Sequence, residues 1–248
     1  MMMSEYEKIE TLFDRDPKTF KVIEGKIRLS EFLIIWSWHI TEKIDGTNVR
    51  IWFRSLYEEG KVVVKANTAL PSYRRIIDIN GRTENAQMPT FLMNYLQRLF
   101  TVEKFQAAFP DLKPEMDVVL YGEGYGPRIQ KGGGNYRKDV SFRLFDVKVD
   151  KWWLEPDNIE SVAEKMGVKT VPSLDNVTIE QAVKLVKSNP FSQVALAEGG
   201  NPDTRMEGIV ARTVPLLLRR NGSRLMWKLK RKDFDRIEDD VKCESKSP

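Results

Sequence analysis

Lys43-Ile44-Asp45-Gly46 follows a mostly apolar run at residues 32–36. Asp-Gly is a strong turn signal, so the pattern predicts that Lys43 ends a buried strand and faces a cleft. Asp45 is expected to orient the lysine, and Gly46 lets the backbone bend there. A lysine amine attacks as a nucleophile only when neutral, a state that nearby cations, a bound metal or partial burial favour. Alone, this tetrapeptide is more often an ordinary surface turn.

Two further lysines lie in an alternating stretch near the end of the sequence. Apolar Leu225, Trp227 and Leu229 alternate there with positions that include Lys228 and Lys230. Period-two alternation predicts a half-buried strand, so both lysines project from one face. Such a pair is suited to gripping a phosphate and to keeping a third amine neutral. The alternative is a solvated strand face.

Two acidic residues lie at the ends of short apolar runs. Glu207 opens the run at residues 207–211, and Glu123 follows the run at residues 118–120. Carboxylates at strand ends can bind a divalent cation or accept a hydrogen bond from a ribose hydroxyl. Magnesium prefers one or two carboxylates together with substrate phosphates, so a single glutamate suffices. For Glu123, an ordinary hairpin acid is the alternative.

Taken in order, these segments resemble the covalent nucleotidyltransferase superfamily of polynucleotide ligases and capping enzymes, and within it the phage RNA ligase 2-like family. The resemblance covers residues 41–234. The segments that resemble motifs I, Ia, III, IIIa, IV and V are residues 42–48, 81–87, 121–130, 142–147, 207–210 and 227–230. Each segment alone is a weak signal, but their order along the chain matches that of the family.

The resemblance implies a catalytic group of four residues. Lys43 would take AMP as a covalent adduct, and Glu207 would serve the metal and the nucleophile. Lys228 and Lys230 would hold the α-phosphate. The implied cofactors are ATP and Mg²⁺, for which Mn²⁺ can substitute. The implied reaction joins a 5′-phosphate to a 3′-hydroxyl end through a lysine-AMP and then an adenylylated 5′ end.

The resemblance also implies contacts to the nucleotide. Glu42 would lie at the adenine edge through its backbone, and Glu123 would accept a hydrogen bond from the ribose. Phe145 would stack on the adenine, while Asn48 and Arg82 would contact the ribose or the polynucleotide 3′ end. Two assignments stay open, because Phe142 competes with Phe145 and motif Ia usually follows motif I more closely than here. The cations that compete with Arg82 are Lys65, Arg74 and Arg75.

The function expected from the resemblance is that of an ATP-dependent RNA ligase acting in RNA repair. Its partner would be RNA, with DNA or RNA/DNA hybrid nicks as alternatives. A DNA nick ligase and a capping-type guanylyltransferase, which would form its lysine adduct with GTP, remain as enzymatic alternatives. A nucleic-acid-binding module without turnover is the non-enzymatic one. The presence of Lys43, Glu123, Glu207, Lys228 and Lys230 argues against the last.

Composition is compatible with a polyanionic partner. The 248 residues carry 40 Lys and Arg against 36 Asp and Glu, which gives a net charge of +4 and a pI of about 9.0. The single cysteine, Cys243, and the single histidine, His39, exclude an intrachain disulfide and a Cys/His zinc or catalytic pair. Without a signal-peptide pattern or a membrane-length apolar segment, we expect a cytoplasmic monomer with no membrane partner.

The fold expected is α+β, a nucleotidyltransferase adenylation core of ATP-grasp-like type with antiparallel sheets flanked by helices. Residues 1–240 would form this single domain, without an OB domain, and residues 241–248 a flexible tail. Helices are expected at residues 5–14, from Pro89, and at 105–109, 158–166 and 179–187. A hairpin is expected at residues 47–66, turning at 58–60, with strands near Val118 and Ser141.

Overall fold

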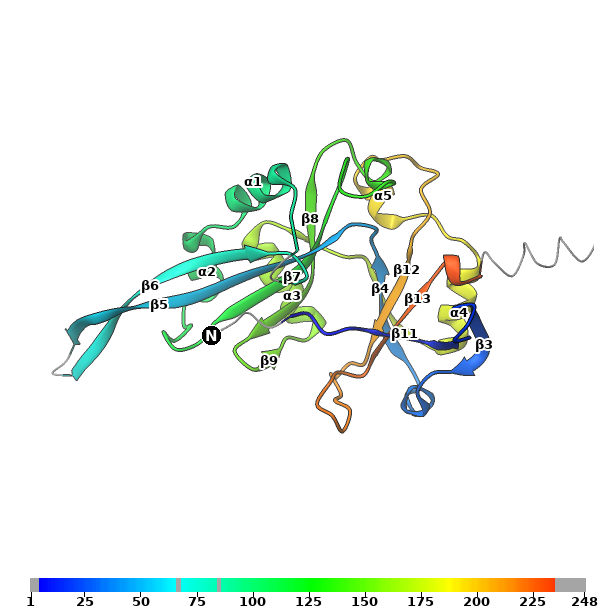
Figure 1. Cartoon of the computed structure of the whole chain (residues 1–248), viewed down its shortest axis with the longest axis horizontal. Coiled ribbons are helices and arrows are strands. Elements are labelled where there is room, and N and C mark those ends of the chain that lie inside the picture. Colours follow the sequence, from blue (N-terminus) through cyan, green and yellow to red (C-terminus); the bar gives the residue numbers. More distant parts are fainter. Residues whose placement is uncertain (1–4, 66–67, 84–85, 235–248) are drawn as a thin grey trace, which may run out of the picture. The chain divides into compact units, whose positions relative to one another are not determined.

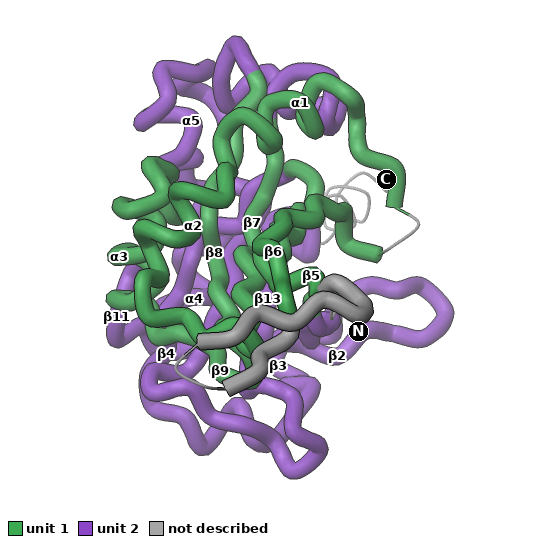
Figure 2. Tube along the Cα trace, turned by 90° about the vertical axis from the view of Figure 1, so that its left-hand side faces the viewer, with its two compact units in different colours: residues 1–6, 46–125, 140–170 green, residues 7–45, 126–139, 171–248 purple. Residues whose placement is uncertain are grey.

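The computed structural model describes residues 5–65, 68–83 and 86–234. Helices and strands are mixed along the chain, which makes the fold α+β as expected (Figure 1). The chain divides into two compact units, coloured separately in Figure 2. Unit 1 comprises residues 1–6, 46–125 and 140–170, and unit 2 comprises residues 7–45, 126–139 and 171–248. The expected tail at residues 241–248 lies outside the described residues.

Unit 2 is built on a five-stranded sheet with the order β1-β13-β12-β4-β11. Its strands are β1 (Glu10–Thr11), β4 (Trp38–Lys43), β11 (Ser173–Val177), β12 (Gly208–Arg212) and β13 (Met226–Lys230). All pairs are antiparallel except β1 with β13. One face buries Ile40, Ile209 and Leu229 with Ala182 and Val186 of α4 (Ile179–Lys187). Because side chains alternate along a strand, the other face carries the lysines.

Smaller elements complete unit 2. Strands β2 (Phe13–Arg15) and β3 (Val22–Ile27) form a separate antiparallel pair. The 3₁₀ helices η1 (Ser30–Ile34) and η2 (Gly133–Asn135) and the short helix α5 (Gln193–Ala197) lie in the connections.

Unit 1 contains a second sheet with the order β10-β8-β7-β5-β6, with β9 added beside β8. Its strands are β5 (Thr47–Lys65), β6 (Thr68–Asn80), β7 (Val118–Tyr125), β8 (Ser141–Val149), β9 (Trp152–Trp153) and β10 (Lys169–Thr170). Its helices are α1 (Thr90–Leu99), α2 (Val102–Ala108) and α3 (Pro156–Met166). The ring of Phe105 in α2 stacks on Phe53 of β5 at 4.7 Å, which joins the helices to the sheet.

The expected helices from Pro89 onward are confirmed, with α1, α2, α3 and α4 within a few residues of their predicted bounds. The expected strands near Val118 and Ser141 are likewise confirmed as β7 and β8. Among the described residues, no helix is long and apolar enough to cross a membrane. The expected antiparallel pairing holds for most strands of both sheets, and the exceptions lie at two edges, where β10 pairs with β8 and β1 with β13 in parallel.

The helix expected at residues 5–14 is wrong. That segment is extended, with β1 pairing beside β13 and Leu12 donating its backbone N–H to the Lys228 carbonyl at 3.0 Å. Leu12 and Phe13 are buried in the core of unit 2. Pairing at a sheet edge therefore overrides a weak helical pattern. The apolar run at residues 32–36 is also not a buried strand, because η1 occupies its start and Trp36 is 87% exposed.

The expected hairpin turn at residues 58–60 is wrong as well. Strand β5 continues through these residues to Lys65, and β6 returns from Thr68. Twelve register pairs join the two strands, so cross-strand pairing outweighs the local turn tendency of a Glu-Glu-Gly sequence. In place of a turn, the ladder has an irregularity at this sequence, where the register shifts between Tyr57 and Val62.

Candidate active site

Lys43 lies in a row of residues across the sheet of unit 2. It is the last residue of β4 and pairs with Gly208 of β12, which pairs in turn with Lys230 of β13. Lys43 and Lys230 therefore lie on either side of Gly208, which has no side chain. Both lysine side chains project from the sheet face opposite the core. This register brings together residues that are almost 190 positions apart in the sequence (230 − 43 = 187).

Glu207 joins the two lysines. Its Oε2 accepts a hydrogen bond from Lys43 Nζ at 2.5 Å, and its Oε1 accepts one from Lys230 Nζ at 2.6 Å. Burial acts to raise the pKa of the Glu207 carboxyl, but the charge of Lys43 and the hydrogen bonds from both lysines outweigh it and hold the pKa below its usual value. Glu207 is therefore an anion at neutral pH. Lys43 also contacts the Ile44 carbonyl at 3.5 Å, whereas the expected contact with Asp45 is not among its bonds to the described residues.

The low pKa of Glu207 leads to a prediction about stability. A carboxyl whose pKa is lower in the folded state stabilises the fold above its unfolded pKa, near 4.5, and loses that contribution as pH falls through the folded pKa. Replacing Glu207 with glutamine should therefore lower the unfolding free energy most near neutral pH. Urea unfolding of both proteins between about pH 7 and pH 3 should show the gap closing toward acid. A gap that widens toward acid would contradict the ion-pair assignment.

Lys228 lies on the same face as Lys230, two residues earlier in β13. It pairs with Val210 of β12, and on its other side with Thr11 of β1. Its side chain is half-buried, as is that of Lys230. The prediction that both lysines share one face is confirmed by this register. The structure thus brings Lys43, Glu207 and Lys230 into direct contact, with Lys228 in the next row.

Glu42 points to the opposite face from Lys43 and is buried. Its carboxylate accepts hydrogen bonds from the Ser192 hydroxyl and from the backbone N–H groups of Gln193 at 2.9 Å and Val194 at 3.2 Å. Its own backbone N–H donates to the Pro172 carbonyl at 2.9 Å. The side chain therefore anchors the start of α5, a role that the sequence did not indicate.

Removing this anchor should destabilise the protein. In a Glu42→Ala variant, a hydroxyl and two backbone N–H groups would lose their acceptor, so the free energy of unfolding should fall by about 1–3 kcal/mol. Chemical denaturation measures this change directly. Glu160→Ala, at an exposed position of α3, is the control and should change it by less than about 0.5 kcal/mol. Equal effects of the two substitutions would show that the Glu42 bonds contribute nothing.

Tyr136 is a residue of this region that the sequence did not reveal. Its buried hydroxyl oxygen accepts a hydrogen bond from the backbone N–H of Asp45 at 3.2 Å, which holds the turn that follows Lys43. Burial raises the pKa of the Tyr136 phenol. The Asp45 bond opposes that effect, and the carboxylates of Glu42, Asp45 and Glu207 add to it. No local motif marks a tyrosine that acts 91 residues away from its partner.

Unit 1 carries the remaining residues predicted to contact the nucleotide. Asn48 of β5 and Glu123 of β7 are direct cross-strand partners. The Asn48 side-chain oxygen is buried and accepts no hydrogen bond from any residue that the structure describes. Glu123 packs against Gly46, where an added Cβ would lie 2.8 Å from its Cγ and 2.4 Å from the Gly124 carbonyl oxygen. Gly46 therefore allows the close approach of Glu123 and Gly124, a reason for a glycine that the sequence did not indicate.

Phe145 and Phe142 have different environments in β8. Phe142 is buried against Phe100, with ring centroids 5.2 Å apart, and is a core residue. Phe145 is half-buried and lies at a bulge, because Tyr121 pairs with Asp146 whereas the next residue, Gly122, pairs with Leu144. An extra residue at a bulge can be turned away from the regular alternation. Phe145 contacts Tyr6 edge-on at 5.2 Å.

Arg82 is exposed in the turn after β6. Its competitor Arg75 is committed to structure, since its guanidinium donates to the carbonyls of Leu112, Lys113 and Met116 at 2.8–3.0 Å. Arg74 is exposed, and nothing is described of the Lys65 side chain. Arg50 is fully buried, and the sequence did not single it out. Its Nε donates a hydrogen bond to the Gly81 carbonyl at 2.7 Å, which fixes the start of the turn at Arg82.

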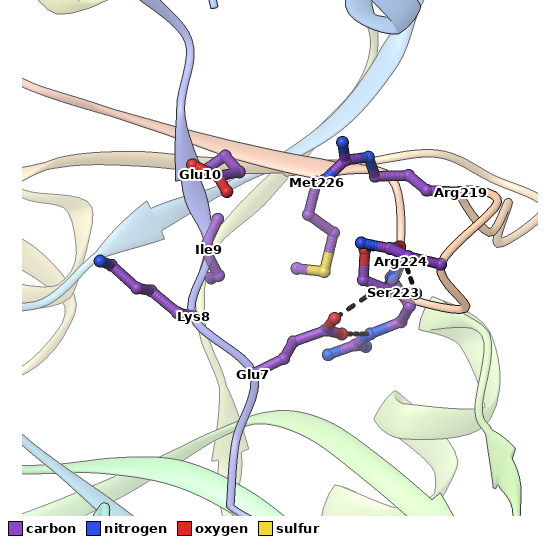
Figure 3. A pocket seen from close by; sticks show the side chains of 9 residues that line it. Glu7, Lys8, Ile9, Glu10, Arg219, Ser223, Arg224 and Met226 are labelled. Atoms are coloured by element: carbon purple, nitrogen blue, oxygen red, sulfur yellow. Dashed lines mark hydrogen bonds and ion pairs between the residues drawn. The ribbon is translucent and has the colours of Figure 1, made fainter. Parts of the chain in front are cut away.

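A pocket of about 230 Å³ lies elsewhere in unit 2, between the segment at residues 7–10 and the start of β13 (Figure 3). Two of its charged residues are paired, because Glu7 accepts from the backbone N–H of Arg224 at 3.2 Å and also from its guanidinium. A third, Glu10, accepts from Arg28 Nε at 2.7 Å. None of the predicted site residues lines this pocket, so it is distinct from the candidate active site.

The residues available for a metal are few. Among the described residues, no group of three His, Cys, Asp or Glu side chains could hold a metal by itself. Glu207 offers a single carboxylate beside two lysines. This arrangement fits a cation that arrives with the phosphates of a nucleotide, as magnesium usually does, rather than a protein-only metal site.

A family model described as RNA ligase matches residues 37–230. The chain is similar in structure to two mutants of a Naegleria gruberi RNA ligase with ATP and Mn, both at 18% identity, with TM-scores of 0.53 and 0.52. These matches cover 96% and 91% of this chain and 59% and 57% of the ligase chains. A third match, the same ligase with PPi, has 20% identity, a TM-score of 0.50 and coverage of 82% and 52%.

No curated protein matches the sequence. The chain spans 52–59% of the length of these ligase chains. At this level of identity, the structural likeness establishes the fold alone.

Proposed function

The chain belongs to the RNA ligase family, and we propose that it is an ATP-dependent RNA ligase that works through a covalent lysine-AMP at Lys43. The observation that carries the proposal is the contact of Lys43 and Lys230 with the two oxygens of Glu207. It combines a nucleophile, an anion that positions it and a cation for phosphate within one hydrogen-bonded group. The family model spans this whole group, from β4 to the end of β13.

In the first step, Lys43 loses the charge that it carries beside Glu207, and its neutral Nζ attacks the α-phosphorus of ATP and releases a second proton to solvent. A phosphorus–nitrogen bond forms, the bond between the α-phosphorus and the bridging oxygen breaks, and pyrophosphate leaves. Glu207 holds the Lys43 side chain in position, while Lys230 and Lys228 provide positive charge where the α-phosphate becomes more negative. Such displacements depend on positioning and charge neutralisation more than on covalent chemistry by the protein.

ATP is proposed as the nucleotide and Mg²⁺ or Mn²⁺ as the metal. The similar structures of Naegleria ligase mutants are structures with ATP and Mn, which supports both choices. Glu207 would be the carboxylate nearest the metal. When bound with the nucleotide, the metal would neutralise phosphate charge.

RNA is proposed as the substrate of the later steps. AMP would pass from Lys43 to a 5′-phosphate, and a 3′-hydroxyl would then attack that phosphate and release AMP. In unit 1 we propose that Glu123 binds the ribose and Phe145 stacks on adenine, while Asn48 and Arg82 contact the ribose or the RNA 3′ end. The buried, unsatisfied oxygen of Asn48 supports its inclusion, because a polar ligand group could satisfy it. The fold proposed is the adenylation core of a nucleotidyltransferase.

Labelling separates the proposal from its alternatives. The protein is incubated with Mg²⁺ and α-labelled ATP or GTP, and then with a nicked duplex whose 5′-phosphate end is RNA or DNA. We expect label from ATP alone, its transfer to the RNA end, and sealing with release of AMP. Labelling from GTP would indicate a capping-type enzyme, and sealing of DNA but not RNA would indicate a DNA ligase. RNA binding without any labelling would indicate a module that does not turn over.

A further inference from the structure

Two exposed tyrosines face each other on the long hairpin of unit 1. Tyr57 of β5 and Tyr73 of β6 are cross-strand partners, and their ring centroids are 6.0 Å apart with an interplanar angle of 51°. The side chains are 46% and 42% exposed. We call this pair the tyrosine step. Its rings form a surface of neighbouring aromatic groups rather than part of the core.

The tyrosine step lies just beyond the part of the hairpin that the helices cover. On the same face, Phe53 stacks against Phe105 of α2, and the Arg75 guanidinium lies 5.1 Å from the Phe53 ring and 5.8 Å from the Tyr73 ring. Arg75 is itself held by three backbone carbonyls between α2 and β7. It therefore marks the end of the covered surface, and the hairpin extends past α2 from there (Figure 1).

The sequence around the tyrosine step is basic. From residue 54 to residue 75 there are five Lys or Arg and two Glu, a net charge of +3 (5 − 2). Arg75 lies on the same face as the two tyrosines, whereas Arg74 is exposed and projects from the opposite face, because side chains alternate along a strand. Aromatic rings within basic surroundings are the usual means of binding single-stranded nucleic acid, because bases stack on the rings while cations attract the backbone.

We propose that the tyrosine step binds single-stranded RNA by stacking its bases on Tyr57 and Tyr73. The inference rests on the proposed function and adds to it a substrate-binding surface outside the lysine-AMP chemistry. RNA fits this surface better than a protein partner, because the exposed group is a pair of aromatic rings in a stretch of net positive charge.

Binding of a fluorescent single-stranded RNA to the whole protein tests the proposal. Tyr57→Ala and Tyr73→Ala are each expected to weaken RNA binding about 5- to 150-fold, the range for loss of one stacked base. Tyr73→Phe keeps the ring and should bind within about 2-fold of the wild type. Tyr73→Val keeps a good strand former without a ring and should bind like the alanine variant.

Controls separate this inference from hairpin damage and from the proposed ligase activity. All variants should form lysine-AMP from ATP as the wild type does. Trp36→Ala removes an aromatic that is 87% exposed in unit 2, and it should leave RNA binding unchanged. Valine or alanine variants that bind RNA normally would overturn the proposal, as would wild-type protein that does not bind RNA. Loss of self-association in place of RNA binding would identify a protein interface and would also overturn it. Absence of lysine-AMP in the wild type would overturn the proposed function without deciding the RNA-binding result.

Discussion

Replacing Lys43 with alanine is expected to abolish formation of the labelled protein from α-labelled ATP, with a loss on the order of 10⁴-fold or more. The variant should still fold, because the Glu207 carboxylate keeps its hydrogen bond with Lys230 at 2.6 Å. Lys43 is only 25% exposed, and the removed side chain lies on the sheet face opposite the core. Gel detection of the protein-bound label measures the loss. The wild-type adduct should be labile to acid and stable to alkali, as a phosphorus–nitrogen bond requires.

Two further variants separate the nucleophile from the ion pair. Lys43→Arg retains a positive charge for Glu207, but a guanidinium does not lose its proton in proteins and should form no adduct. Lys184→Ala removes an exposed lysine from α4, on the other side of the same sheet, and should label normally. Normal labelling of Lys43→Ala, or labelling of Lys43→Arg at the wild-type rate, would disprove the assignment of Lys43.

The sequence predicted the centre of the site because the relevant patterns are local. Alternation along residues 224–230 indicated a strand with Lys228 and Lys230 on one face, and β13 has that form. The Asp-Gly turn indicated that a strand ends at Lys43, and β4 ends there. What the sequence did not supply was the register that pairs Lys43 with Gly208 and Gly208 with Lys230, because pairing between distant strands depends on the whole sheet.

Residues that support the site from a distance escaped prediction. Tyr136 fixes the turn after Lys43, and Ser192 contacts the buried carboxylate of Glu42 from 150 positions away. Neither belongs to a motif, and an acid beside a lysine looks the same in the sequence whether it is buried or exposed. The wrong turn at residues 58–60 has a similar origin, since short-range turn tendencies do not account for a long antiparallel ladder. The bulge that gives Phe145 and Phe142 different environments could not be predicted from the sequence either.

Replacing Gly208 with alanine is the second substitution for which a large effect is expected. Gly208 lies between Lys43 and Lys230 in the sheet and directly follows Glu207. An added Cβ would lie 2.1 Å from the Leu229 carbonyl oxygen and 2.8 Å from the Lys230 Cα, both backbone atoms that cannot move aside as a flexible side chain does. Strand β13 would have to shift away from β12, which should lower the unfolding free energy by about 2–4 kcal/mol.

The same shift should also disrupt catalysis, because it separates Lys230 from Glu207. Displacements of about 1 Å can cost on the order of 100-fold in rate, so lysine-AMP formation should fall by at least that factor even in the folded fraction. Gly132→Ala is the matched control, since an added Cβ there would meet only the Asn135 side-chain nitrogen, at an ordinary 3.8 Å, and the backbone has a negative φ. Urea unfolding and single-turnover labelling of both variants make the comparison. The idea that close contact of β12 with β13 aligns Glu207 between the two lysines would be disproved if Gly208→Ala behaved like Gly132→Ala in both measurements.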